Sequence, residues 1–267
     1  MKQHPYAKGM GKTRYLVSGS RIDVCYVINF LSCFMHNPGI KHWKSFKRVL
    51  RYLNHTKNYG ICYSRSQSGS PLMPLLLGWS DSNWGGNLDS RRSTSGFLFM
   101  LAGGAISWSS KRQMAVILSS AEAEFVAVAQ ATKEGMWIQM LLTELNMIPQ
   151  PSLITFQVSC IYLARNPKHS EKTKHMDLKY HFIREMVEEK KLFLEHTSTE
   201  DMWTDFLTKP LSVLRDAARK LVWSQYRPDV LLYHLRRPVS MEGAIAHLDD
   251  PPNVSLYHLD RTYRPSL

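Results

Sequence analysis

The chain has 267 residues, of which 44% are hydrophobic, and its 34 Lys and Arg against 22 Asp and Glu give a formal charge of +12. This length allows one large domain or two small ones, and the hydrophobic content excludes a globally disordered chain. The basic balance suits a polyanionic partner, with nucleic acid as the first candidate, although charge alone fits a basic protein without such a partner equally well.

The sequence contains four cysteines: Cys25, Cys33, Cys62 and Cys160. None forms a CxxC pair or a zinc-like spacing with histidine, so we expect buried thiols in a reducing compartment. The first 14 residues, MKQHPYAKGMGKTR, lack the apolar core of a signal peptide. The most apolar run, residues 72–79, is too short to cross a bilayer. We therefore expect an intracellular protein, cytoplasmic or nuclear, without a transmembrane segment.

Two helices are expected near the start of the chain. Residues 22–36 carry apolar side chains at helical spacing, and Asn37-Pro38-Gly39 then ends that helix. Residues 42–56 form the second helix, apolar on one side and basic on the other. The basic residues are Lys44, Lys47, Arg48 and Arg51. This basic side is either a solvated helix face or a surface that follows a phosphate backbone, and the pattern leaves both open.

The middle of the chain reads as strands. Residues 59–65 and 72–79 are strand-like, and the polar connector between them predicts a domain boundary near residue 70. A strand then ends at Asp81, and two more strands follow with Gly103-Gly104 as the hairpin turn between them. These two strands are expected at 95–103 and 105–113.

The pattern then becomes mainly helical. Ser119-Ser120 cap a long helix, residues 121–145, with Glu122 in its first turn and Gly135 as a point of division. The remaining elements are a strand at 154–158, a short helix at 159–166, a helix at 174–190, a strand at 191–197 and a helix at 198–209 capped by Ser198 or Thr199. This order predicts an α/β domain with a mixed sheet, and from residue 212 the pattern decays into an irregular tail.

Three acids stand on separate elements of this expected sheet. Asp81 ends a strand, Glu124 lies in the first turns of the long helix, and Asp205 lies inside the last helix in an apolar setting. Carboxylates that converge from separate elements suit Mg²⁺, and a pair of such ions would clamp a phosphodiester. With 22 acids in the chain, spacing alone favours the alternative of ordinary surface carboxylates and helix-start acids.

Longer words in the sequence are more specific. Together, GWSDSNWGG, SGFLFMLAGGAISWSSKRQ, LSSAEAEFVAVAQATKEGMWIQMLL, TKHMDLKYHFIRE and FLTKPL closely resemble the ribonuclease H domain of copia-type retrotransposon polyproteins. The upstream segment, up to residue 63, resembles the C-terminal end of the adjoining reverse transcriptase, without the polymerase's Asp-Asp motif. The resemblance implies a reverse-transcriptase remnant at 1–70, a ribonuclease H-like domain with a five-stranded mixed sheet at 71–211, and a tail at 212–267.

The family's catalytic set is four acids, and the resemblance carries three of them onto Asp81, Glu124 and Asp205. The remaining acid of the family's set is the Asp of a Cys-Asp-Asn sequence. Counting back from Ala164-Arg165-Asn166-Pro167 places it at Phe156. A shifted alignment does not restore it, because no aspartate lies between Asp89 and Asp177 and the nearest glutamates are Glu144 and Glu171. Phe156 is therefore the expected lost catalytic position.

The resemblance also implies nucleic-acid contacts. Arg91 and Arg92 would contact phosphate, or form an exposed turn, and Lys174 and His175 would lie near a hybrid backbone, or on a solvated helix face. The expected function is hydrolysis of the RNA strand of an RNA–DNA hybrid with Mg²⁺, impaired at Phe156. The alternatives are a non-catalytic module that binds nucleic acid and a translated transposon relic.

Overall fold

The structure of the chain is a computed structural model. It describes residues 4–63, 76–87, 89–147, 154–158, 174–197 and 202–209, with the backbone alone at 154–157 and 174–177. Contacts divide the chain into two units, Met1–Tyr226 and Arg227–Leu267, and every described residue belongs to the first. The short helix expected at 159–166, the tail, and the boundaries expected near residue 70 and at 211–212 lie outside the described residues. The division into three regions therefore stays a prediction.

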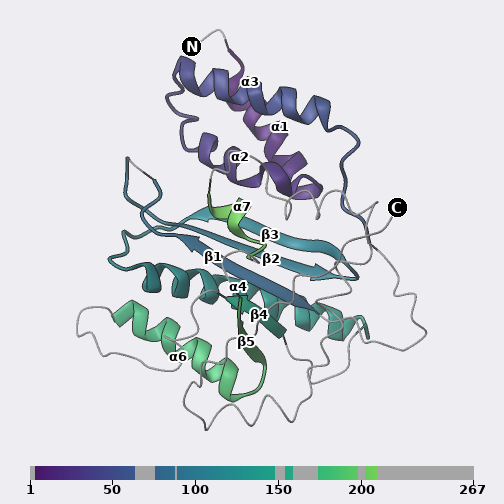
Figure 1. Cartoon of the computed structure of the whole chain (residues 1–267), viewed down its shortest axis with the longest axis vertical. Coiled ribbons are helices and arrows are strands. Elements are labelled where there is room, and N and C mark those ends of the chain that lie inside the picture. Colours follow the sequence, from purple (N-terminus) through teal and green to yellow (C-terminus); the bar gives the residue numbers. More distant parts are fainter. Residues whose placement is uncertain are drawn as a thin grey trace, which may run out of the picture. The chain divides into compact units, whose positions relative to one another are not determined.

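Five strands in the described part of the chain form one mixed sheet (Figure 1). They are β1 (Leu77–Asn83), β2 (Thr94–Leu101), β3 (Gly104–Arg112), β4 (Ile154–Val158) and β5 (Leu192–His196). Their order is β3-β2-β1-β4-β5. The first three are joined as antiparallel neighbours, whereas β4 runs parallel to both β1 and β5. The predicted α/β fold with a mixed sheet is confirmed.

Two details that we predicted for the antiparallel strands are wrong: the residues of the turn between β2 and β3, and the end of β1. The turn between β2 and β3 consists of Ala102 and Gly103, with φ of 50° and 76°, and Gly104 already belongs to β3. Two positive φ angles are what a tight hairpin turn requires. Strand β1 does not end at Asp81 but continues to Asn83, because Asp81, Ser82 and Asn83 pair with Gly96, Ser95 and Thr94 of β2. Asp81 therefore lies within the strand.

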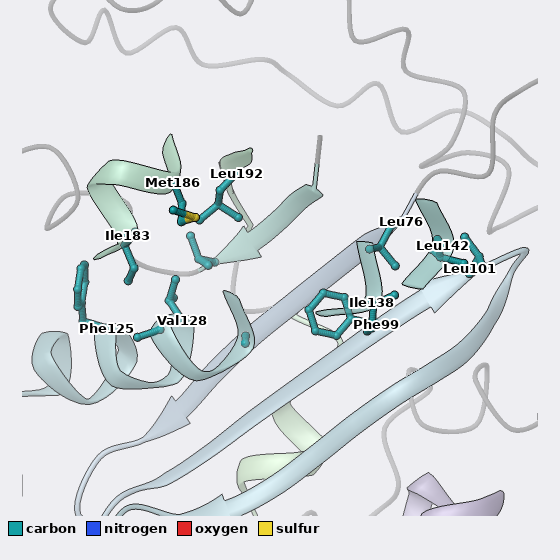
Figure 2. Close-up of a cluster of buried hydrophobic side chains, with 13 residues drawn as sticks. Leu76, Phe99, Leu101, Phe125, Val128, Ile138, Leu142, Ile183, Met186 and Leu192 are labelled. Carbon is teal, nitrogen blue, oxygen red and sulfur yellow. The ribbon is translucent and has the colours of Figure 1, made fainter. Parts of the chain in front are cut away.

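One face of the sheet is covered by α4 (Ser120–Glu144) and α6 (Lys174–Glu188). Figure 2 shows Phe125 and Val128 of α4 beside Ile183 and Met186 of α6, and all four belong to one buried apolar cluster. Burying each such side chain contributes about 1.5–3 kcal/mol, so this cluster is the main source of stability for the sheet. The division expected at Gly135 is wrong, because α4 continues unbroken through this buried glycine.

Ahead of the sheet lie three helices and a 3₁₀ turn: α1 (Tyr6–Gly19), η1 (Ile22–Val24), α2 (Cys25–Ser32) and α3 (Ile40–His55). The Tyr6 hydroxyl donates to the Leu31 carbonyl at 2.8 Å, and its ring meets Phe46 edge-on with centroids 5.8 Å apart. These contacts tie α1 to α2 and α3. The helical character expected for this region is confirmed, but the strand expected at 59–65 is wrong over residues 59–63, which form no strand.

A buried ion pair joins the end of α3 to η1. Arg21 donates to both carboxylate oxygens of Asp23, from Nε at 2.9 Å and from Nη2 at 2.7 Å, and Tyr52 donates to Asp23 Oδ2 at 2.9 Å. Arg21 also donates to the carbonyl of Thr56 at 3.0 Å and to its hydroxyl at 2.6 Å. Burial would lower the pKa of Arg21, but Asp23 outweighs this and raises it. Both charges are therefore fully paired.

The helices contact the sheet through β3. Trp108 Nε1 donates to the Val17 carbonyl at 3.2 Å, and Asn29 Nδ2 donates to the Ser110 carbonyl at 2.7 Å. Cys25 is buried in α2, and this burial raises the pKa of its thiol to about 12, whereas Cys33 is exposed. The expectation of buried thiols is confirmed for Cys25 and wrong for Cys33. Of the helices in the described residues, none is long and apolar enough to span a membrane.

Candidate functional site

Alternate residues of β1 contact the segment 203–208, which includes the short helix α7 (Asp205–Thr208). The rings of Trp79 and Trp203 stack with centroids 5.6 Å apart and planes 21° apart. Two positions on, the Thr208 hydroxyl donates to Asp81 Oδ2 at 2.6 Å. Asn83 Nδ2 donates to the Thr208 carbonyl at 3.2 Å. Successive side chains of a strand alternate between its faces, so α7 lies on the face of β1 that carries Asp81.

Gly96 of β2 allows this close approach. It lies directly opposite Asp81 across the β1–β2 pair, and a Cβ atom there would lie 2.8 Å from Thr208 Cγ2 and 2.9 Å from Leu207 Cβ. Both distances are shorter than ordinary van der Waals contact. The missing side chain at Gly96 therefore leaves the space in which α7 packs over Asp81.

Asp205 is the first residue of α7 and, like Asp81, is buried. The prediction that it lies inside a long final helix is wrong, because the described helix has only four residues and begins at Asp205 itself, with Thr204 as N-cap. Lys209 Nζ lies 2.7 Å from Asp205 Oδ1 and 3.8 Å from Asp81 Oδ2. The structure therefore brings two of the three predicted acids around one ammonium group.

This arrangement perturbs the titration of Asp81. Burial raises its pKa above the ordinary value, and the charge of Asp205 adds to that increase. The hydrogen bond from Thr208 and the charge of Lys209 oppose it without cancelling it. A buried carboxyl with a raised pKa beside a second carboxylate is typical of functional sites, and it is also a place where a cation is stabilising.

Glu124, the third predicted acid, lies in the second turn of α4 and is half-buried. The predicted cap is confirmed, because the Ser119 side chain accepts from the Glu122 backbone N–H at 3.2 Å. Gln113 ties this helix start to β2 by donating to the Ala123 carbonyl at 2.9 Å and to the Ser95 hydroxyl at 2.8 Å. Among the described residues, however, no three His, Cys, Asp or Glu side chains gather as a metal site. The place of Glu124 beside Asp81 and Asp205 therefore stays a prediction.

The backbone of β4 gives the position of Phe156. It pairs with Gly78 of β1 and with Leu194 of β5, so it lies three residues before the level of Asp81. Three residues span about 10 Å along a strand. The last pair of this ladder is Ser80 with Val158, so no described residue of β4 lies level with Asp81. Neither Phe156 nor Ser159 is acidic.

The predicted basic contacts are only partly placed. Arg91 is exposed and Arg92 half-buried in the loop between β1 and β2. Buried Asn87 organises this loop: its carbonyl accepts from the Arg91 N–H at 2.7 Å, and its side chain accepts from the Ser90 N–H at 2.9 Å. Lys174 and His175 lie in the first turn of α6, but their side chains are outside the described part.

Two residues at this site were not predicted from the sequence. Thr208 and Lys209 follow Asp205 at the third and fourth positions, within the word FLTKPL. Residues three and four positions after an Asp lie on the same side of a helix as that Asp. A Thr-Lys pair at these positions after Asp205 could therefore have predicted the two contacts.

The mixed sheet carries one buried acid in its central strand β1 and another at the start of α7, as expected from the resemblance to ribonuclease H domains. No family model matches the chain. The retrovirus-related Pol polyprotein of transposon TNT 1-94 from Nicotiana tabacum is 37% identical over 210 residues, which cover 78% of this chain and 15% of that polyprotein. The corresponding polyprotein of transposon RE2 from Arabidopsis thaliana is 42% identical over 205 residues, which cover 76% and 14%. The chain belongs to this family of copia-type transposon Pol polyproteins, as its sequence predicts, and spans about one seventh of these two relatives.

Two further similarities concern parts of the chain. Secreted RxLR effector protein 161 of Plasmopara viticola is 44% identical over 138 residues, which cover 52% of this chain and 94% of that protein. Among solved structures, LC11-RNase H1 in complex with an RNA/DNA hybrid aligns with a TM-score of 0.38 at 15% identity, covering 50% of this chain and 93% of that one.

Proposed function

We propose that this domain binds RNA–DNA hybrids and holds one divalent cation between Asp81 and Asp205, and that its cleavage of the RNA strand is impaired. The observation that carries the proposal is the pair of buried carboxylates around Lys209, at 2.7 and 3.8 Å from its ammonium nitrogen. Two buried carboxylates that lie close to each other favour a cation between them.

The residues present fit one ion better than two. Asp81 and Asp205 offer hard carboxylate oxygens, and Mg²⁺ is commonly held by one or two carboxylates together with water and substrate phosphates. A bound Mg²⁺ would polarise a phosphate oxygen and lower the pKa of a bound water. Thr208 would keep the Asp81 carboxylate oriented through its 2.6 Å hydrogen bond, and Lys209 would turn toward solvent. We propose one ion only, because Asp81 and Asp205 are the described acids that lie around Lys209.

The missing acid is the physical reason for impairment. No Asp or Glu lies between Glu144 and Glu171, so β4, which pairs with β1, carries no carboxylate whatever the register of the two strands. Removing one member of a catalytic unit removes most of the rate acceleration of the whole unit. We therefore infer that hybrid binding is retained and cleavage is weak.

A second candidate function is a non-catalytic module that binds nucleic acid. The helical region from residue 4 to residue 63 contains ten Lys and Arg and a single acid, Asp23. That acid is buried against Arg21, whereas the nine other basic side chains are exposed. The accessible charge of these helices is therefore wholly positive, which favours contact with a phosphate backbone.

The test is cleavage of a labelled RNA–DNA hybrid by the full chain with Mg²⁺. We expect little or no product from the unmodified chain and measurable product from Phe156→Asp. Ser159→Asp is the matched variant, because it adds the same charge to the residue that follows the last described pair, Ser80 with Val158. Adding Asp81→Asn to the more active variant should abolish the product. Robust cleavage by the unmodified chain contradicts the impairment, and hybrid binding without cleavage by either Asp variant favours the non-catalytic module.

A further inference from the structure

A pocket of about 280 Å³ lies where α1 and α2 meet β3 and the start of β2. It is separate from the Asp81–Asp205 pair, since neither acid lines it. None of the described residues that line it is acidic, whereas Arg14, Lys111 and Arg112 are basic. A concave surface lined by one sign of charge concentrates ions of the opposite sign, so the pocket suits an anion.

The two arginines come from different parts of the fold. Arg14 belongs to α1 and Arg112 ends β3, and both side chains are exposed at the pocket. On β3, Arg112 shares a face with Ser110 and Trp108, and Trp108 contacts α1 through the Val17 carbonyl. A guanidinium presents a planar fork of donors that matches a phosphate group, which a lysine ammonium does not.

The inner wall of the pocket is polar. Asn29 Nδ2 donates to the Ser110 carbonyl at 2.7 Å, and both residues line the pocket. Ser110 is only 4% exposed, and its hydroxyl has no hydrogen-bond partner in the described part of the chain. The wall of the pocket is therefore polar as well as basic, which suits a ligand that carries hydrogen-bonding groups.

The outer wall is aromatic. The rings of Tyr26 and Phe30 lie with centroids 6.3 Å apart and planes 18° apart. Phe30 is 40% exposed although it stands beside a polar, positively charged pocket. An exposed ring next to exposed arginines is an arrangement with which proteins stack an unpaired base.

We propose that this pocket takes one nucleotide of an unpaired nucleic-acid strand. The phosphate lies between Arg14 and Arg112, and the base stacks on Phe30. The volume of about 280 Å³ is just below the range of ligand pockets, which run from about 300 to 1,000 Å³, and so suits one nucleotide and not a duplex. The inference rests on the proposed function only in the choice of nucleic acid as the polyanion.

The test measures binding of a fluorescent single-stranded oligonucleotide to the full chain by anisotropy. Arg14→Gln with Arg112→Gln is compared with Lys44→Gln with Arg48→Gln, which removes the same charge from the exposed face of α3. We expect the pocket pair of substitutions to weaken binding about tenfold or more and the α3 pair to weaken it less than about threefold. Phe30→Leu should weaken binding about fivefold or more while leaving the salt dependence unchanged. A blunt hybrid duplex should respond much less to all pocket variants.

Equal losses from the two charge-matched pairs overturn the pocket, because they show a general charge effect. An unchanged affinity in Phe30→Leu overturns base stacking, and equal sensitivity of duplex and single strand overturns the unpaired strand. Melting curves confirm that each variant is folded before it is assayed. The tests of the pocket and of the proposed nuclease are independent. If only the pocket variants lose strand binding, the pocket is supported even where no hybrid is cleaved. If Phe156→Asp restores cleavage, the proposed nuclease is supported even where the pocket variants bind normally.

Discussion

Two buried clusters of charge in this chain are built on opposite principles. In the helical region, the Arg21 cluster is neutral: one arginine faces one aspartate, Arg21 also donates twice to Thr56, and Tyr52 donates to Asp23. In the sheet region, the Asp81 cluster holds two aspartates and one lysine, and that lysine is 36% exposed. The Arg21 cluster is buried and its two charges balance, whereas the Asp81 cluster has two acids to one lysine and that lysine reaches the solvent.

This difference distinguishes a charge pair that stabilises the fold from charges that are kept for function. Burying an ion pair costs desolvation energy, which is offset only where geometry is good and all hydrogen bonds are made. The Arg21 cluster meets this condition with partners at 2.6 to 3.0 Å. The Asp81 cluster does not, since burial still raises the pKa of Asp81 despite Thr208 and Lys209. A fold keeps such an uncompensated acid at the expense of stability, which is typical of a functional site.

The largest expected effect is in the balanced cluster. Asp23→Asn would leave the Arg21 guanidinium buried without its counter-charge, and breaking a buried pair in this way costs about 3–5 kcal/mol. The measurement is the free energy of unfolding of the full chain in urea at neutral pH. Lys191→Met is the control, because it breaks a half-exposed surface pair with Glu189 and should change the free energy by less than about 1 kcal/mol. An Asp23→Asn loss no larger than that of the control contradicts a structural role for the cluster.

A smaller effect is expected where the acidic cluster loses its lysine. Lys209→Met would leave Asp81 and Asp205 as neighbouring carboxylates, and we expect a loss of about 1 kcal/mol without divalent ions, since the half-exposed ammonium is partly screened by solvent. About 10 mM Mg²⁺ should stabilise this variant more than the parent, because a ligand that binds only the folded state raises its stability. Thermal melting with and without Mg²⁺ measures both effects.

The same Lys191→Met control separates a site effect from a general one. It removes an equal charge from a Lys–Glu pair in which both side chains are more than 40% exposed, and Mg²⁺ should not restore its stability. Equal responses of the two lysine variants to Mg²⁺ would show that the Asp81–Asp205 pair is not a cation site.

The sequence predicts the elements of this fold well where local patterns are strong. Alternation gave β2, and the Ser119 cap gave the start of α4, because both are decided by neighbours along the chain. Helix α1 was missed because its sequence, YAKGMGKTRYLVSG, contains three glycines, which are unfavourable within a helix. One of them, Gly9, gives room to a neighbour: a Cβ there would lie 2.7 Å from the Phe46 ring of α3.

The sequence predicted the two acids of the candidate site but not the residues that contact them. Asp81 and Asp205 stand out because family words surround them. The bond from Thr208 to Asp81 joins residues 127 positions apart, and it exists only because Gly96 admits α7 to the face of β1. No local pattern encodes such a contact. For the same reason, the sequence alone did not show that Phe156 pairs with Gly78 and not with a residue at the level of Asp81.

The smallest expected effect compares the two clusters through one substitution. Asp81→Asn removes a buried charge that the fold does not fully compensate, so we expect it to stabilise the chain by a few tenths to about 1 kcal/mol at neutral pH, opposite in sign to Asp23→Asn. The folded-state pKa of Asp81 is raised, so its penalty is present above that pKa and falls away as the pH drops toward the unfolded value of about 4. The stability difference between Asp81→Asn and the parent should therefore shrink over that interval, and urea unfolding at several pH values measures it. If Asp81→Asn is instead less stable than the parent, Asp81 is a structural charge like Asp23. The physical reason for treating the Asp81–Asp205 pair as a site then no longer holds.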